Sequence, residues 1–117
     1  MLETVDVEKS RLLTHLQRRT VKNFMDILVL AELRKRPMSG YDVITSIYRR
    51  FNFLPSSGSI YSLLYSLERK ELVKGAWSER KRIYVLTLKG EEILEASKVM
   101  YGKIERLVTK IFSDGLL

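Results

Sequence analysis

Residues 56–90 read SSGSIYSLLYSLERKELVKGAWSERKRIYVLTLKG, and this stretch decides the fold. Serines open a helix whose apolar residues recur at the spacing i, i+3, i+4, i+7 of one helix face: Ile60, Leu63, Leu64 and Leu67. Two segments typical of strands follow, 72–77 and 82–86, and the charged residues 78–81 between them predict a hairpin turn. The stretch therefore predicts a helix followed directly by a two-stranded hairpin with a charged tip.

The outer face of this helix lacks the Glu and Lys of an ordinary solvated face. It carries hydroxyls, two phenols and one guanidinium instead: Ser59, Tyr61, Ser62, Tyr65, Ser66 and Arg69. The hairpin tip adds three adjacent cations, Arg80, Lys81 and Arg82. Such side chains hydrogen-bond to base edges and neutralise phosphates. The alternatives are small residues at a helix start, a solvated turn, and a Tyr61 that packs the helix onto the hairpin.

The residues before this stretch predict two further helical segments. No Gly or Pro precedes Pro37, so residues 6–36 can be helical throughout, bent or continuous, and must leave the helix before the proline. Ser39 can cap a second helix, with Asp42 three positions on at the positive end of its dipole. This helix has roughly ten residues and ends before Pro55.

The C-terminal segment predicts a long helix over residues 89–112, capped by Thr87. Its apolar seam has the heptad spacing 4, 3, 4, 3, 4 with one polar interruption: Ile93, Ser97, Met100, Ile104, Leu107 and Ile111. Such a helix is roughly 35 Å long at 1.5 Å per residue. A small domain cannot easily cover a seam of that length, so a partner chain is favoured over packing within the same chain.

Composition narrows the class of protein. The chain has 117 residues, which predicts one domain, and it carries a net charge of +7, no Cys and one His. Residues 56–89 hold seven cations against three anions, whereas residues 90–117 hold four against five. This balance favours an anionic partner for the middle segment. A thiolate zinc site, a disulfide framework and a multi-histidine metal cluster are excluded, and we expect no cofactor and no enzyme activity, since no nucleophile–base pair or Gly-rich phosphate loop is present.

The sequence also predicts where in the cell the protein is found. No apolar run approaches the ~18 residues of a membrane span, and the N-terminus is acidic and polar, unlike a signal peptide. We therefore expect a cytoplasmic protein that does not bind membranes.

The order of three helices, a hairpin and a further helix predicts a winged helix-turn-helix, mainly α with a two-stranded β wing. In this fold the third helix enters the DNA major groove and the wing reaches the flanking backbone. The candidate DNA-binding residues are Ser57, Ser59, Tyr61, Ser62, Tyr65, Arg69, Arg80, Lys81 and Arg82. Arg49 and Arg50 are further candidates for backbone contacts, whereas Arg18, Arg19 and Lys22 read as a solvated helix face.

Four stretches resemble the PadR family of transcriptional regulators. They are 27–30 leading into 37–44, then 58–64, 67–73 and 82–90, which read ILVL…PMSGYDVI, GSIYSLL, LERKELV and RIYVLTLKG. The resemblance covers more than half of the chain. One departure is Glu71, which stands where the family usually has Gly. A left-handed conformation would cost Glu about 1 kcal/mol, so either the helix ends differently here or the strain is tolerated.

The resemblance implies a homodimer in which the C-terminal helix packs on the partner's N-terminal helix. We thus divide the chain into an N-terminal helical extension (1–22), a winged-helix DNA-binding domain (23–88) and a C-terminal dimerisation helix (89–117). The candidate dimer residues are Leu13, Leu16, Ile93, Met100, Ile104, Leu107 and Ile111. A small-molecule effector is also implied as a possible partner, of unknown identity.

The predicted function is a sequence-specific DNA-binding regulator that binds a pseudo-palindromic operator as a homodimer. Repression is favoured over activation, because no segment resembles an activation surface. The alternative is a winged-helix module that binds proteins without reading DNA. Trp77 is expected in the core or the dimer interface, with ligand stacking as its alternative.

Overall fold

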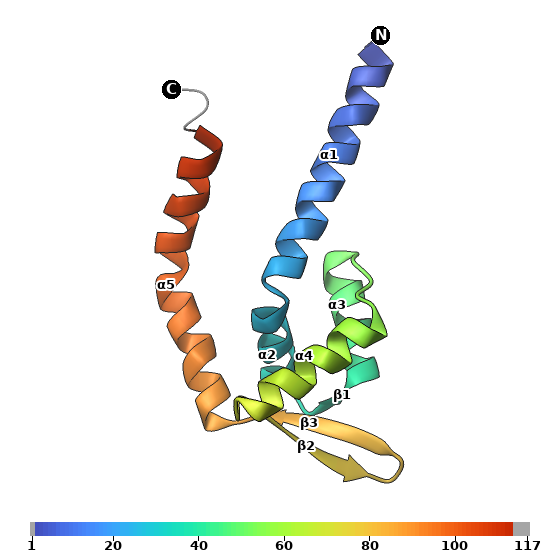
Figure 1. Ribbon diagram of the computed structural model, residues 1–117, viewed down its shortest axis with the longest axis vertical. Helices are drawn as coiled ribbons and strands as arrows, with labels where there is room; N and C mark the ends of the chain where they lie inside the picture. Colours follow the sequence, from blue (N-terminus) through green and yellow to red (C-terminus); the bar gives the residue numbers. More distant parts are fainter. Residues whose placement is uncertain (1, 114–117) are drawn as a thin grey trace.

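The computed structural model describes residues 2–113 and places five helices and three strands among them (Figure 1). In chain order they are α1 (Leu2–Asn23), α2 (Met25–Lys35), β1 (Met38–Ser39), α3 (Gly40–Phe51), α4 (Ser57–Arg69), β2 (Val73–Ser78), β3 (Lys81–Leu86) and α5 (Leu88–Ser113). The predicted order of helices and hairpin is confirmed, and both hairpin strands begin within one residue of their expected positions. The short strand β1 was not predicted.

The core lies where α2, α3 and α4 pack together with the sheet. The apolar face predicted for α4 supplies its centre, since Ile60 and Leu64 are fully buried. Val43 and Ile47 of α3 and Val29 of α2 are also fully buried against them. This packing fixes α4 to the body by one face and leaves its other face free.

The N-terminal helical segment bends at Phe24, which separates α1 from α2. Phe24 leaves the helical region, with φ −108° and ψ 19°, although the carbonyl of Phe24 still accepts from the Leu28 amide at 3.0 Å. The sequence allowed a bent or a continuous helix, and the bent form is found. As a result α1 projects away from the body (Figure 1).

The predicted capping residues start α3 and α5. Ser39 Oγ accepts from the Asp42 amide, and the Asp42 carboxylate accepts from the Ser39 amide, both at 3.1 Å. That amide hydrogen bond is the main reason why the pKa of Asp42 is lowered. Thr87 Oγ accepts from the Gly90 amide at 3.0 Å and donates to the Glu71 carbonyl at 2.6 Å.

The sheet has the strand order β1-β3-β2 and is antiparallel throughout. Met38 pairs with Tyr84, and the hairpin closes at Ser78 opposite Lys81. Glu79 in the turn adopts φ 57°, and Glu71 before β2 adopts φ 64°. Of the two alternatives for Glu71, the left-handed conformation is therefore the one found.

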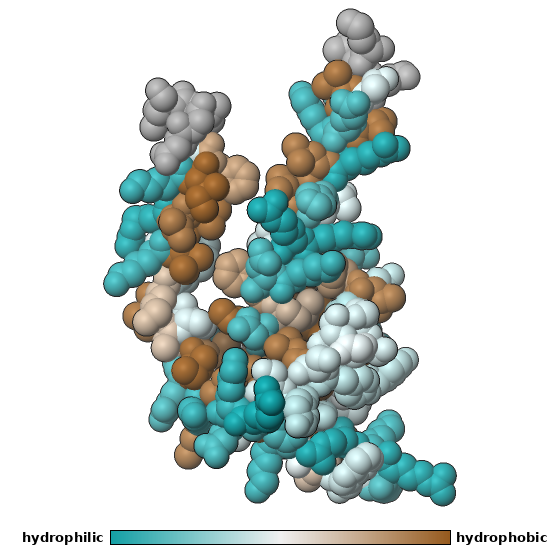
Figure 2. Space-filling model, in the orientation of Figure 1, coloured by the Kyte–Doolittle hydropathy of each residue, from teal (hydrophilic) through white to brown (hydrophobic). Residues whose placement is uncertain are grey.

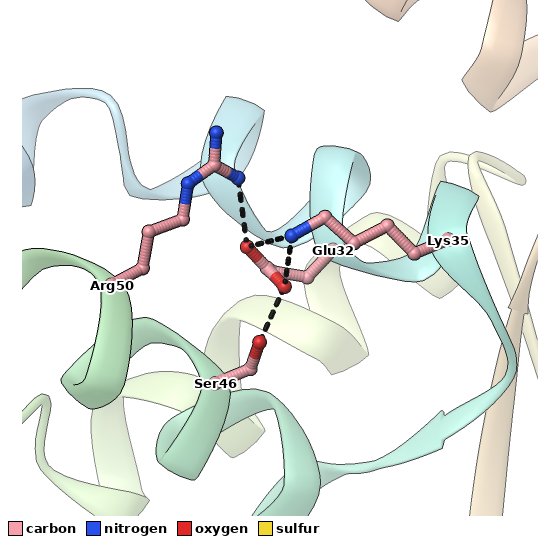
Figure 3. Close-up of polar contacts among 4 residues, drawn as sticks. All are labelled: Glu32, Lys35, Ser46 and Arg50. Atoms are coloured by element: carbon pink, nitrogen blue, oxygen red, sulfur yellow. Dashed lines mark hydrogen bonds and ion pairs between the residues drawn. The ribbon is translucent and has the colours of Figure 1, made fainter.

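A buried carboxylate joins α2 to α3 (Figure 3). The Glu32 side chain is fully buried and accepts from Ser46 Oγ, from Lys35 Nζ at 3.1 and 3.2 Å, and from Arg50 Nη1 at 3.2 Å. Burial alone raises the pKa of Glu32, but the hydrogen bonds from Ser46, Lys35 and Arg50 outweigh it and hold that pKa below its ordinary value. One nitrogen of Arg50, a candidate for DNA backbone contacts, is therefore bound to Glu32, while its side chain is 52% exposed.

The described part of the chain is extended rather than compact. Its Cα radius of gyration is 17.2 Å, against about 13 Å expected for a compact chain of this length. Figure 1 shows the cause: α1 and α5 project in the same direction as two arms with a gap between their ribbons. Within residues 2–113 none of the helices is both long and apolar enough to cross a membrane.

Candidate nucleic-acid interface and dimer seam

The outer face of α4 is exposed, as the sequence predicts. Tyr65 is 62% exposed and Tyr61 47%. The remaining candidates of this helix are exposed as well: Ser57, Ser59, Ser62 and Arg69. Figure 2 shows this helix as a pale, hydroxyl-rich surface on the front of the molecule, above the hydrophilic wing. The structure thus brings the predicted polar residues together on one side of one helix.

The two tyrosines of α4 have different surroundings. A Cβ added at Gly40 would lie only 2.5 Å from Tyr61 Cε1, so the Tyr61 ring lies against the backbone at the start of α3. Tyr65 has Arg69 as its neighbour, with the guanidinium carbon 5.2 Å from the ring centroid. Tyr65 and Arg69 therefore form one polar and aromatic unit at the solvent face.

The serines at the start of α4 combine capping with exposure. Ser56 is the N-cap, and its Oγ accepts from the Ser59 amide at 3.1 Å and donates to Ser59 Oγ at 2.7 Å. Ser57, in the first turn, is exposed beside them. Hydroxyls at this position are typical phosphate contacts in protein–DNA complexes.

The three cations of the wing do not share one environment. Arg80 and Lys81 are exposed. The Nη2 atom of Arg82 instead contacts the Glu68 carboxylate of α4 at 2.9 and 3.0 Å. The same carboxylate accepts from the Gly75 amide of β2 at 2.7 Å. Glu68 therefore clamps α4 to both strands of the wing, and Arg82 belongs to this clamp.

The clamp also shifts the pKa values of Glu68 and Arg82 in the directions that favour their charged forms. The hydrogen bond from the Gly75 amide and, after it, that from Arg82 hold the pKa of Glu68 below its ordinary value, and the hydrogen bond that Arg82 donates to Glu68 raises the pKa of Arg82. Sequence reasoning missed Glu68, although its place on α4, one turn before the wing, was a usable signal.

Trp77 lies on the wing surface and is 70% exposed, so the expectation of a core position is wrong. Trp77 occupies β2 opposite Arg82, whose guanidinium carbon lies 5.9 Å from its ring centroid. Val73 and Trp77 lie four positions apart and share one face of β2, but Val73 is buried at the end of the strand next to the body, whereas Trp77 is exposed next to the turn.

The α5 seam is uncovered along most of its length. The side chains of Ile93, Met100, Ile104, Leu107 and Ile111 are all between 40% and 65% exposed. Packing of this seam within the same chain, the alternative raised by the sequence, is therefore excluded for these residues. Beside the seam lies an apolar groove of about 660 Å³, with Phe24 and Ile27 on one wall and Tyr101, Ile104 and Val108 on the other.

Leu13 and Leu16 of α1 lie elsewhere. They line a separate hollow of about 820 Å³ that α1 forms with Phe51 and Phe53 at the end of α3. Leu13 is exposed and Leu16 half-buried. The structure therefore brings five of the seven predicted dimer residues together on α5 and leaves these two on a different apolar surface.

The described residues contain no group of three His, Cys, Asp or Glu side chains arranged to hold a metal ion. His15 is exposed on α1.

Comparison with known proteins agrees with this geometry. The model of a family described as "Transcriptional regulator PadR-like family" matches residues 29–96, more than half of the chain. None of the curated protein sequences matches. Among solved structures, a PadR family transcription regulator from Clostridium difficile R20291 is 26% identical, with a TM-score of 0.68 over 76% of this chain and 98% of its own.

Two further structures share the fold. A PadR family transcriptional regulator from Eggerthella lenta is 22% identical, with a TM-score of 0.72 over 96% of this chain and 97% of its own. PadR of Bacillus subtilis in complex with operator DNA is 22% identical, with a TM-score of 0.57 over 64% of this chain and 45% of its own.

Proposed function

Because the chain belongs to the PadR-like family of transcriptional regulators, we propose that it binds a pseudo-palindromic operator as a homodimer and represses transcription from it. The observation that carries this proposal is the exposed polar face of α4 beside Arg80 and Lys81, two exposed cations of the wing. Tyr65 and Arg69 meet base edges in the major groove, and Ser57, Ser59 and Ser62 meet phosphates or bases at its wall. Arg80 and Lys81 neutralise phosphates beyond the groove.

The shape of α4 supports major-groove reading. Only one face of the helix is buried, so the opposite face is free to enter a groove about 12 Å wide. The Glu68 clamp supports the role of the wing, because it holds Arg80 and Lys81 at a fixed position relative to α4. A fixed wing loses little conformational entropy on binding.

The exposed α5 seam supports the homodimer. The described chain is an extended monomer whose two arms carry exposed apolar side chains, a feature that marks interaction surfaces in soluble proteins. A second copy would cover it by placing its own arm in the groove between α1–α2 and α5. Two α4 helices related by the dimer axis then read half-sites about 34 Å apart, one turn of DNA. Repression follows if the bound dimer occludes the promoter.

Fluorescence anisotropy on duplexes tests the proposal. The protein is titrated onto DNA from its own upstream region and onto a scrambled duplex at several salt concentrations. We expect preferential binding, two chains per site and a steep salt dependence. The Arg80→Gln/Lys81→Gln variant should reduce the steepness of log K against log salt by about 3.6, because each of the two protomers loses two phosphate contacts and each contact contributes about 0.9.

A matched control removes two charges far from α4, in the variant Lys9→Gln/Arg11→Gln of α1. This control should retain the wild-type slope. Equal and weak binding of the wild type to both duplexes contradicts the proposal and favours the alternative, a winged-helix module that binds proteins.

A further inference from the structure

The C-terminal end of α1 lies beside the start of α4. An open cleft of about 710 Å³ separates them, and its walls combine Arg18 and Lys22 of α1 with Ser56 and Ser59 of α4 and Leu54 of the preceding loop. Two cations from the N-terminal extension thus face the two serines that open the DNA-reading helix. The sequence interpretation of Arg18 and Lys22 as a plain solvated face did not anticipate this neighbourhood.

Both cations are available for a ligand. Arg18 and Lys22 are exposed, and neither forms an ion pair with any residue in the described part of the chain. One carboxylate also lines the cleft, that of Asp26, which already accepts from the Ile27 amide at 2.9 Å. By contrast, Lys35, Arg50 and Arg82 are bound to buried or half-buried carboxylates.

We propose that Arg18 and Lys22 bind the phosphates of the DNA that flanks the half-site, so that the DNA-binding surface continues from α4 onto α1. This inference rests on the proposed function, since it assumes that α4 lies in the major groove. The wing and α1 would then hold the duplex from both sides of α4.

The continuity of the surface identifies DNA as the ligand. Figure 2 shows a hydrophilic band over the lower half of α1, directly above the pale surface of α4, with the hydrophilic wing below it on the same face. A duplex seated on α4 carries one phosphate charge per ~1.7 Å of its axis, so it presents phosphates to both neighbours of that helix. Ser56 and Ser59 connect the two regions, because they belong to the cleft and to the start of α4.

The test compares salt dependence in matched variants of the full chain. In a dimer, Arg18→Gln/Lys22→Gln removes two phosphate contacts from each protomer, which reduces the steepness of log K against log salt by about 3.6, at about 0.9 per contact. The affinity advantage of the wild type over this variant should therefore shrink about 150-fold between 50 and 200 mM salt. The Lys9→Gln/Arg11→Gln variant removes the same charge from the same helix, but Arg11 lies about 10 Å further from α4 than Arg18, at 1.5 Å per residue. It should retain the wild-type slope.

Two additional measurements separate phosphate binding from a structural role. The variant Arg18→Lys/Lys22→Arg retains both charges and should restore the slope. A duplex trimmed of its flanking base pairs lacks the proposed phosphates, so on it the wild type and Arg18→Gln/Lys22→Gln should bind with equal affinity and slope.

The outcomes are distinct. An unchanged slope in Arg18→Gln/Lys22→Gln, while the wild type still prefers its operator, overturns the inference and leaves the proposed function intact. A loss of affinity that is equal at all salt concentrations, or that persists on the trimmed duplex, also overturns it, because it indicates a defect of folding or dimerisation. A wild type without operator preference contradicts the proposed function itself.

Discussion

Replacing the buried carboxylate of Glu32 tests how α2 is joined to α3. In the wild type this carboxylate accepts hydrogen bonds from one hydroxyl and two cationic side chains across the two helices. Glu32→Gln retains the shape and removes the charge, whereas Glu32→Ala removes the acceptor and leaves a void. Both variants are compared with the wild type at equal protein concentration, since dimerisation links stability to concentration.

The expected magnitudes follow from the burial of each partner. The side chains of Lys35 and Arg50 are both 52% exposed, so water replaces Glu32 as their partner and each pair contributes well under 1 kcal/mol. The Ser46 hydroxyl donates to a charged acceptor, an interaction of about 1.5–3 kcal/mol. In Glu32→Ala the void left by the side chain adds to the lost hydrogen bond, so this variant should lose about 3–4 kcal/mol of unfolding free energy. Glu32→Gln leaves no void and should lose about 1–2 kcal/mol.

The pH dependence has a definite sign. The pKa of Glu32 is lowered in the folded state from an ordinary value of 4.5. A carboxyl group of this kind stabilises the fold fully above its unfolded pKa, and that contribution is lost as pH falls through the lowered folded pKa. The difference in stability between wild type and Glu32→Gln should therefore be constant near neutral pH and shrink below about pH 4.5.

Urea unfolding followed by circular dichroism measures these differences. The midpoint should fall without a change of slope, which shows that stability rather than compactness has changed. A cost below about 1 kcal/mol for Glu32→Ala would refute the reasoning. So would a difference from Glu32→Gln that grows on acidification.

Three further predictions concern the wing, the start of α5 and the dimer. Glu68→Gln should lower stability by about 1 kcal/mol, because its pair with Arg82 is partly exposed, and weaken operator binding several-fold; additive effects of Glu68→Gln and Arg82→Gln on urea midpoints would contradict the clamp. Gly90→Ala should cost about 3 kcal/mol, because its Cβ would lie 2.1 Å from the Leu72 carbonyl oxygen; an unchanged melting temperature would argue against this contact. Ile104→Glu should yield monomers in analytical ultracentrifugation, and a dimer that persists would place the interface elsewhere.

Most of the local structure could be predicted because its causes lie within a few residues of each other. Ser39 and Asp42 cap α3, and Thr87 caps α5, through contacts three positions apart. The apolar face of α4 follows from the 3.6-residue period. Glu71 adopts the left-handed conformation that the family pattern implies.

The remaining features depend on contacts between distant residues. The strand β1 consists of Met38 and Ser39 alone and exists only because β3 pairs with it. The side chain of Arg82 contacts Glu68, fourteen positions earlier in the chain. Of the three adjacent cations in the sequence, Arg80 and Lys81 are therefore exposed, while Arg82 is paired with a carboxylate. The pattern of a hairpin also does not specify how far burial extends from its open end towards the turn, so Trp77 is exposed although Val73 on the same face is buried.

The exposed position of Trp77 gives the protein an optical reporter of its own wing. Trp77 is the sole tryptophan of the chain, so all indole emission comes from one site on β2. Its ring is in contact with solvent and next to the Arg82 guanidinium, whose position the Glu68 clamp sets. Fluorescence intensity and anisotropy decay at this single residue therefore report whether the wing is rigid, freed or covered, without any added dye.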